Sequence, residues 1–408
     1  MGSVRLLTLS LVALLALAAV PPAAGQEGTS ADVPLVRLRD GHRSDLLFRV
    51  NPRTLQQVGR PIRTFRNGAG LGFSPGGTRI AYSGGNPRRF GIQIVDLARW
   101  RSLGIARPAR RAQLSVGWAS EDRVVAWTQY AERPRIFWID ARTRRVVGRR
   151  SFSGWAMDAL AVPAGLALAL APREGLGPLR IMVVEPNGGA RTITVDGIKA
   201  GSDHEPGGEV LTPAVTVDPQ SGRMYVVAAR GLLVAEVDLA SGAVAYHSLG
   251  ASASKGDVDV WWRTAAWAGD GRIAVTGDHW PPVHGRQPSD GPVPLGVRLI
   301  DTVSWSIATL DRRPDSMHVA GGTILAAGTR WLDGGRRSES TGLLAFDESG
   351  HLAFTRFRRL PVALLGSRGH CGYVWLRHTR TAHVLDLRTG RTLHTIRTGP
   401  RAPFLLSP

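Results

Sequence analysis

Cysteine and lysine are the two residue types that this 408-residue sequence almost lacks. Cys371 is the only cysteine, so the chain forms no internal disulfide and packing must stabilise its fold. Lys199 and Lys255 are the only lysines among 51 basic residues, and arginine supplies the rest. With 32 acidic residues the formal net charge is +19, and an excess of this sign attracts polyanions. An arginine-rich, lysine-poor composition is also typical of a GC-rich genome, so the sequence leaves both origins of the excess open.

Enzyme signatures and helical periodicity are also missing. The sequence contains no P-loop, no dinucleotide-binding fingerprint and no sialidase-type Ser-x-Asp-x-Gly-x-x-Trp box. No stretch beyond residue 25 shows a sustained helical period. These absences argue against the common nucleotide-binding α/β enzymes and favour a binding module over an enzyme.

The first 25 residues are typical of an export signal. Arg5 supplies a positive start, Leu6–Val20 is an apolar run, and Ala23–Gly25 offers small residues for cleavage before Gln26. We expect a signal peptide over 1–25, a spacer over 26–33, and a secreted or extracytoplasmic protein at the cell envelope. The apolar run is short for a membrane span of about 20 residues. We therefore expect no span after cleavage, and an uncleaved anchor is the alternative.

Short apolar runs separated by turn residues fill the chain from residue 34 to 408. In the best-formed stretch, the runs Leu71–Phe73, Arg79–Tyr82 and Gly91–Val95 are followed by a weaker strand around Trp100–Leu103. Gly, Pro and Asp lie between the runs, as tight turns require. This four-strand pattern recurs about every 45 residues, a period typical of a repeat fold.

Eight repeats can be recognised by the third strand and the turn that follows it. These segments are Leu46–Gly59, Ile92–Gly104, Ile136–Gly148, Ile181–Val195, Leu233–Leu249, Val297–Leu310, Leu343–Phe354 and Ala382–Ile396. A four-stranded unit cannot bury both faces alone, so the repeats must stack into a ring. We therefore predict an all-β fold, a β-propeller of eight four-stranded antiparallel blades in a single domain over 34–408. Seven blades is the alternative, if the segment 34–62 or 157–197 is not a full blade.

The first repeat is one strand short. It contains only the runs Leu35–Leu38, Leu46–Val50 and Leu55–Ile62. The C-terminal segment Pro403–Pro408 has the pattern of an innermost strand, so we predict that it closes the ring by joining blade one. We also expect the tryptophans in or beside strands to form core between blades: Trp118, Trp127, Trp138, Trp261, Trp262, Trp267 and Trp375.

These motifs resemble a known family. Phe73–Tyr82 reads FSPGGTRIAY, Val237–Gly242 reads VDLASG and Leu385–Gly390 reads LDLRTG. In this the chain is similar to bacterial WD40-like propellers of the TolB and YVTN types, although it contains no Trp-Asp pair. The resemblance implies a binding or interaction module. LDLRTG is also similar to quinoprotein repeats, but Leu393 and His394 stand where those repeats place a tryptophan, so we predict no cofactor.

Propeller topology sorts the loops onto two faces. We call top the face with the loops between the second and third strands of a blade and between successive blades, and bottom the face with the other turns. Arginines gather in top-face loops, and a basic top face would bind an anionic partner. The predicted binding residues are Arg88, Arg89, Arg110, Arg111, Arg133, Arg173, Arg286, Arg336, Arg337 and Trp280. Arg149, Arg150, Arg312, Arg313, Arg358 and Arg359 belong to the same face.

Two long top-face loops carry the weaker metal candidates. His204 lies in one loop, and His279 and His284 in the other, together with Asp203, Glu205 and Asp278. Histidine and carboxylate suit zinc or a similar ion. The spacing is not that of a recognised metal motif, so exposed polar loops are the default expectation.

The sequence thus favours an exported binding module at the cell envelope. Its partner would be a protein or an anionic envelope polymer, with nucleic acid disfavoured, and we expect a monomer. The alternative is a lactonase-like or lyase-like propeller enzyme that uses the central channel, since such enzymes scatter their few polar residues around the ring.

Overall fold

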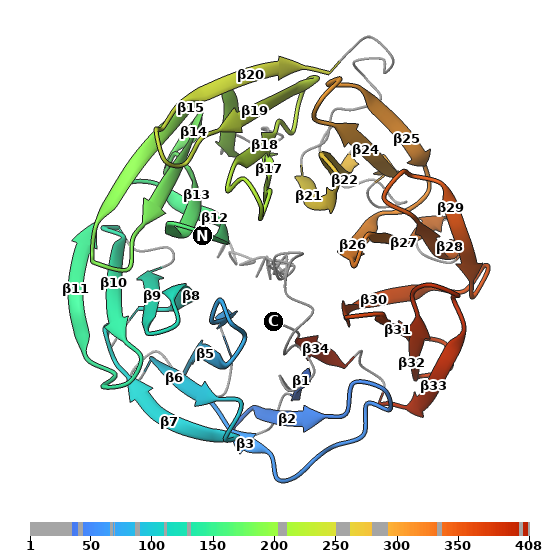
Figure 1. Ribbon diagram of the computed structural model, residues 1–408, viewed down its shortest axis with the longest axis horizontal. Helices are drawn as coiled ribbons and strands as arrows, with labels where there is room; N and C mark the ends of the chain where they lie inside the picture. The colour runs from blue at the N-terminus through green and yellow to red at the C-terminus, as the bar shows by residue number, and fades with distance from the viewer. Residues whose placement is uncertain are drawn as a thin grey trace, which may run out of the picture.

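The computed structural model describes residues 35–39, 44–65, 68, 70–85, 90–109, 112–128, 132–202, 210–249, 262–279, 293–332, 337–399 and 403–406. Their regular secondary structure is entirely β-strand, arranged as eight antiparallel sheets around one axis (Figure 1). No helix that could cross a membrane occurs among them. The predicted signal segment lies outside the described residues.

Each sheet is one blade, and its strands lie side by side in order from the ring axis outward. Blade one contains β34 (Phe404–Leu406), β1 (Leu35–Arg39), β2 (Leu46–Val50) and β3 (Ile62–Arg63). Blade two contains β4 (Gly70–Phe73), β5 (Arg79–Gly84), β6 (Gly91–Asp96) and β7 (Arg101–Ala106). Blade three contains β8 (Leu114–Ser120), β9 (Arg123–Thr128), β10 (Arg135–Asp140) and β11 (Val146–Ser151).

Blades four and six carry additions to the four-strand plan, whereas blade five between them has four strands. Blade four contains β12 (Trp155–Val162), β13 (Gly165–Ala171), β14 (Gly175–Val184) and β15 (Ala190–Ser202), with β16 (Val210–Leu211) added at its edge. Blade five contains β17 (Ala214–Val217), β18 (Met224–Val227), β19 (Leu233–Val237) and β20 (Val244–Ser248). Blade six contains β21 (Trp262–Gly269), β22 (Arg272–His279), β24 (Val297–Asp301) and β25 (Ile307–Asp311), and β23 (Val293–Pro294) also pairs with β22.

The last two blades return to the plain four-strand plan. Blade seven contains β26 (Ser316–Ala320), β27 (Thr323–Leu332), β28 (Arg337–Phe346) and β29 (Leu352–Arg356). Blade eight contains β30 (Val362–Arg368), β31 (Cys371–Leu376), β32 (Thr381–Asp386) and β33 (Thr392–Arg397). The eight-blade prediction is confirmed, because the strands of 34–62 belong to a four-stranded sheet and those of 157–197 to a five-stranded one.

The C-terminal strand closes the ring as the sequence predicts. β34 pairs antiparallel with β1, with Leu405 opposite Arg37. The outermost strand of blade one differs from the prediction, since β3 is the short pair Ile62–Arg63 and not the whole of 55–62. Leu55 begins no strand because it has a positive φ of 54° and packs, 2% exposed, against the core between blades eight and one.

The core lies between neighbouring blades and in most places is lined by both. Trp118, 1% exposed, packs in the cluster shared by blades two and three, and its Nε1 donates to Gly72 O at 2.8 Å. Trp127 and Trp138 pack between blades three and four, and Trp375 between blades eight and one. Trp262 is an exception, because it is 47% exposed at the start of β21. Trp261 lies outside the described residues.

The turn after each third strand is built on an acceptor side chain, as the sequence suggested. In seven of the eight blades an Asp or Asn carboxylate or amide oxygen accepts backbone N–H bonds from its own turn: Asn51, Asp96, Asp140, Asp238, Asp301, Asp347 and Asp386. Blade four uses Asn187 instead, which accepts from Gly189 N at 2.8 Å. Backbone hydrogen bonds hold the pKa of Asp140, Asp301 and Asp347 below its usual range.

Candidate anion-binding site

The structure describes two of the predicted binding residues with their side chains. Arg133 is exposed in the loop between β9 and β10, and Arg173 is exposed in the loop between β13 and β14. Arg337 and His279 belong to β28 and β22, with side chains outside the described part. The remaining candidates lie outside the described residues: Arg88, Arg89, Arg110, Arg111, Arg286, Arg336, Trp280, His204 and His284. The described residues hold no group of three possible metal ligands, which leaves the histidine prediction untested.

Arg173 links the top-face loops of blades three and four. Its Nη1 donates to Glu132 O, beside Arg133, at 2.6 Å. Within the described part of the chain neither arginine forms an ion pair, although Glu132 and Glu174 are their sequence neighbours. In the described part of the chain Arg173 is thus held by a backbone contact, and neither Arg133 nor Arg173 is neutralised by direct pairing.

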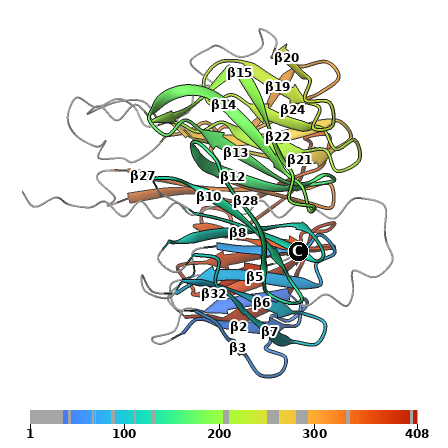
Figure 2. The same cartoon turned by 90° about the vertical axis from the view of Figure 1, so that its left-hand side faces the viewer.

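A pocket of about 120 Å³ opens between the same two blades. Its lining residues come from β11 and the loop after it, and from β13, β14 and β15: Arg150, Ser151, Phe152, Ser153, Leu170, Arg180, Met182, Ala190 and Thr192. Figure 2 views the ring from the side on which β10 and β14 lie, so that blades three and four face the viewer. The lining contains two guanidinium groups and three hydroxyls, and no carboxylate.

Strand register explains why the two arginines face each other. In blade four Arg180 pairs with Leu170, and paired residues share one face of a sheet. Leu170 packs against blade three, so Arg180 is directed toward blade three as well. In blade three Arg150 pairs with Ile136, which belongs to the same core cluster. Arg150 is therefore directed toward blade four from the opposite side.

Hydrogen bonds to fixed backbone atoms orient both guanidinium groups. Arg150 Nη1 donates to Ala190 O at 2.6 Å, across the interface. Arg180 Nη1 donates to Ser153 Oγ at 2.8 Å, and its Nη2 donates to Ser153 O at 3.1 Å. Gly154 makes room for this contact, because a Cβ there would lie 2.7 Å from Arg180 Nη2 and 2.3 Å from Ala171 O. The arrangement suits binding of an anion.

Sequence reasoning placed Arg150 on the top face but missed Arg180. Arg180 stands between Leu179 and Ile181, which are both fully buried, in the third strand of blade four. A charged residue between core residues of a strand faces the neighbouring blade, and this alternation is the signal that could have found it. Locating the pocket itself needs the register across two blades.

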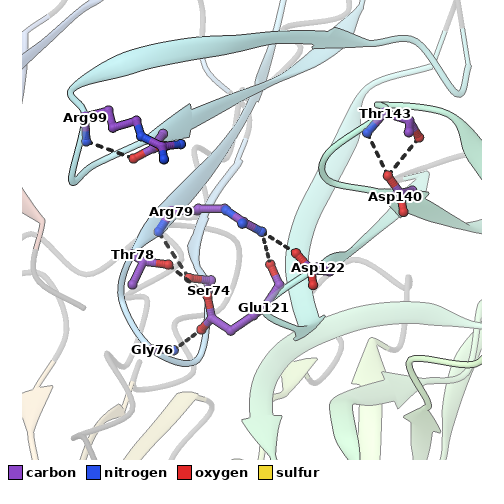
Figure 3. A network of polar contacts seen from close by, with 10 residues as sticks. Ser74, Gly76, Thr78, Arg79, Arg99, Glu121, Asp122, Asp140 and Thr143 are labelled. Carbon is purple, nitrogen blue, oxygen red and sulfur yellow. Dashed lines mark hydrogen bonds and ion pairs between the residues drawn. The ribbon is translucent and has the colours of Figure 1, made fainter.

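Ser74 stands in the string Gly72–Gly76, Gly-Phe-Ser-Pro-Gly, which has the spacing of a hydrolase nucleophile elbow. It is not one here, because the string is the hairpin between β4 and β5 and no helix follows it. Ser74 is 3% exposed, and its Oγ accepts from Arg79 N at 3.1 Å (Figure 3). Its role is to close the turn.

Three partly buried titratable groups belong to the two inner strands of their blades. Burial raises the pKa of Asp158, at the β-bulge of the innermost strand β12, to about 7, and its carboxylate accepts a hydrogen bond from Ala159 N. Burial, aided by the charge of Asp315, also raises the pKa of Asp278 to about 7. Burial lowers the pKa of His318 to about 4, and this side chain bonds Ser367 Oγ at 2.7 Å.

No family model and no curated protein matches the sequence. Three solved structures are similar in fold. The dihydro-heme d1 dehydrogenase NirN in complex with DHE has a TM-score of 0.60 and 13% identity, over 95% of this chain and 77% of that one. The Dos1 propeller has a TM-score of 0.49 and 9% identity, over 81% and 83% of the two chains.

The Cps50 (Swd1) β-propeller domain of Myceliophteria thermophila has a TM-score of 0.40 and 11% identity, over 81% of this chain and 96% of that one. At these identities the likeness concerns the fold alone. The resemblance to bacterial WD40-like propellers of the TolB and YVTN types therefore stays a prediction. The chain is an eight-bladed β-propeller.

Proposed function

We propose that this chain is an exported binding module of the cell envelope and that its basic top face recognises an anionic partner, either an envelope polymer or an acidic protein surface. The proposal rests on the exposure of the top-face arginines of blades three and four and on their lack of ion pairs in the described part of the chain. Arg133, Arg149, Arg150 and Arg173 are exposed, and among the described residues none of them pairs with a carboxylate.

Charges on the bottom face are used differently. Carboxylates there accept backbone N–H bonds from their own turns, as Asp140 and Asp386 do. Arginines also occur in these turns, so the two faces differ in how the charges are paired more than in their number. Arg79 binds Asp122 at 2.7 Å and Arg388 lies 3.8 Å from Asp386. These bottom-face charges are therefore engaged in holding turns and blades together.

The top face is not uniform. Arg313, one of the other arginines assigned to this face, forms a close ion pair with Asp311 at 2.5 Å and is neutralised by it. Arg358, in the loop between β29 and β30, donates from Nε to Thr355 Oγ1 at 3.3 Å and stays exposed beside Arg359. Exposed arginines without an ion pair in the described part thus lie over blades three and four, after blade seven and, as Arg107 does, between blades two and three.

The test compares two variants of equal charge. One replaces the top-face residues Arg133, Arg149, Arg150 and Arg173 by alanine, and the other replaces the bottom-face residues Arg142, Arg145, Arg388 and Arg391. Binding of the mature protein to a glycerol-phosphate polymer, a sulfated polysaccharide and neutral dextran would be measured at low ionic strength. We expect the top variant to lose at least tenfold in affinity for the anionic polymers and the bottom variant to lose little. Equal losses in both variants would contradict a specific top face.

A second function is favoured by one observation, the carboxyl of Asp158. A group with a pKa of about 7 on the innermost strand is suited to general acid or base catalysis at neutral pH. An enzyme acting at the ring axis on lactones or acidic polysaccharide would use it. A turnover assay on such substrates, in which Asp158→Asn abolishes activity while leaving polymer binding intact, would favour this second function over the first.

A further inference from the structure

We infer that the pocket between blades three and four is a binding site for a tetrahedral oxyanion, a phosphate or sulfate group carried by the anionic partner. The inference rests on the proposed function, because it names the chemical group that the basic top face recognises. It assigns the central contacts to Arg150 and Arg180, one from each blade.

The charge of the pocket is the first argument. Its lining contains two guanidinium groups and no carboxylate, and within the described part of the chain neither Arg150 nor Arg180 forms an ion pair. Two positive groups directed into one pocket repel each other unless an anion lies between them. By contrast, Arg79 at the interface between blades two and three forms an ion pair with Asp122. For Arg150 and Arg180, the anionic ligand would supply the negative charge that Asp122 supplies to Arg79.

The number and direction of free donors is the second argument. Arg150 uses Nη1 for Ala190 O, and Arg180 uses Nη1 and Nη2 for Ser153, which leaves Nε on both and Nη2 on Arg150. Thr192 also lines the pocket and pairs with Met182, which packs against blade three, and its hydroxyl has no hydrogen-bond partner among the described residues. These donors come from β11, β14 and β15, thus from both blades. One guanidinium fork satisfies a planar carboxylate, whereas a phosphate or sulfate accepts from several directions.

The size and rigidity of the pocket limit the ligand further. A volume of about 120 Å³ is well below the ~300–1,000 Å³ of pockets that enclose drug-sized ligands. The pocket would therefore take one ionic group and leave the rest of the partner on the surface. Gly154 (φ 93°) lets the Ser153 backbone reach Arg180, so the guanidinium is oriented before the ligand arrives. Such preorganisation reduces the entropy lost on binding.

The test measures binding of inorganic phosphate and sulfate to the mature protein by calorimetry, with chloride and acetate as the other anions. We expect Arg150→Ala and Arg180→Ala each to weaken phosphate binding tenfold or more, as charge-assisted bonds of ~1.5–3 kcal/mol imply. The control is Arg191→Ala, beside Thr192 on β15 but directed to the other face of the sheet because it pairs with Val183. It should change affinity less than twofold.

Thr192→Val keeps both arginines and tests the site if an arginine variant fails to fold. It should weaken phosphate binding several-fold and leave the thermal midpoint without ligand close to that of wild type. Acetate bound as tightly as phosphate, or phosphate bound equally by all variants, would overturn the inference.

The two proposals fail separately. Phosphate binding that depends on both arginines, without any polymer binding, supports the oxyanion site and contradicts the proposed function. Binding of the anionic polymers that Arg150→Ala leaves unchanged contradicts the site and keeps the proposed function. Comparing the glycerol-phosphate polymer with the sulfated polysaccharide distinguishes the two sources of the group. Loss of binding to one of them on Arg180→Ala identifies it as the source and supports the site.

Discussion

The interfaces between blades two and three and between blades three and four are built on the same plan but use arginine in different ways. At the first, Arg79 donates to Glu121 O at 2.6 Å and to Asp122 Oδ1 at 2.7 Å, and Glu121 also accepts from Gly76 N and, at 2.9 Å, from Thr78 Oγ1 (Figure 3). At the second, Arg150 and Arg180 bond only backbone and serine oxygens in the described part.

The difference distinguishes arginines whose charge is used to hold two blades together from arginines whose charge is available to bind a ligand. The network around Arg79 is closed, because donors and acceptors from both blades satisfy one another. The pocket around Arg150 and Arg180 is open, because positive charge and hydroxyl donors exceed the acceptors that the lining supplies. An arginine count from sequence treats the two groups alike. If the two interfaces differ in this way, they should respond differently to substitution, salt and ligand.

The largest expected effect concerns the core of the first interface. Trp118→Ala removes a side chain that is 1% exposed and bonded to Gly72 O, and should lower the free energy of unfolding by about 3–5 kcal/mol. Urea denaturation followed by circular dichroism measures it. Trp262→Ala is the control, since Trp262 is 47% exposed and should cost less than about 1 kcal/mol. Similar costs for the two would mean that the interface core is not where stability resides.

Gly154→Ala tests how the open interface is preorganised. The new Cβ would meet Ala171 O at 2.3 Å at a φ of 93°, so we expect a cost of about 1–3 kcal/mol and displacement of the Arg180 guanidinium. Gly175→Ala separates strain from crowding, because Gly175 also has a positive φ but a Cβ added there would meet no atom within 4 Å. Phosphate affinity should fall for Gly154→Ala and stay unchanged for Gly175→Ala. A fall in both would remove the special role of Gly154.

Glu121→Gln tests the closed network. The substitution removes the negative charge and one acceptor oxygen from the contacts with Gly76 N and Thr78 Oγ1, and should cost about 0.5–1.5 kcal/mol. Part of the cost should disappear at high salt, since the network is partly exposed. Thermal unfolding at low and high salt measures both. A variant whose stability equals that of wild type at low salt would show that the network is dispensable.

The last comparison concerns pH and Asp158, on the innermost strand of blade four. The pKa of Asp158 is raised to about 7 by burial, so the folded protein binds a proton there that the unfolded chain releases above its ordinary pKa near 4. This group therefore adds stability as pH falls from 8 to 5. The buried His318, with its pKa lowered to about 4, acts in the opposite direction below about 6.5.

Asp158→Asn isolates the carboxyl from the histidine. The variant should be more stable than wild type at pH 8, where the buried carboxylate is charged, and close to wild type at pH 5. Thermal midpoints at the two pH values give the comparison. An equal difference at both values would mean that Asp158 does not titrate in this range.

The fold was predictable from local patterns, whereas the site was not. Turn chemistry at Asp96, Asp140 and Asp386 marks the third strands, and the incomplete first repeat predicts the closing role of Pro403–Pro408, so blade number and ring closure follow from the chain alone. The error at 55–62 arose because Leu55 looks like a strand residue but anchors a turn in the core.

The arginine site depends on relations between blades, which no local pattern encodes. Arg133 and Arg173 could be placed on the top face from loop order. Arg180 could not be associated with Arg150, because their meeting depends on the register of β13 with β14 and on the packing of two blades. Likewise, the pairing that neutralises Arg313 comes from the conformation of its own loop beside Asp311.

The most direct test of the central claim is the salt dependence of binding to a phosphate-bearing polymer, measured for wild type, Arg150→Ala and Arg79→Ala. If Arg150 is available for ligand and Arg79 is engaged in structure, affinity should fall steeply with salt for wild type and for Arg79→Ala. The slope of log affinity against log salt should be shallower by about one for Arg150→Ala. A slope near zero for wild type, or the same slope for all three proteins, would contradict the account.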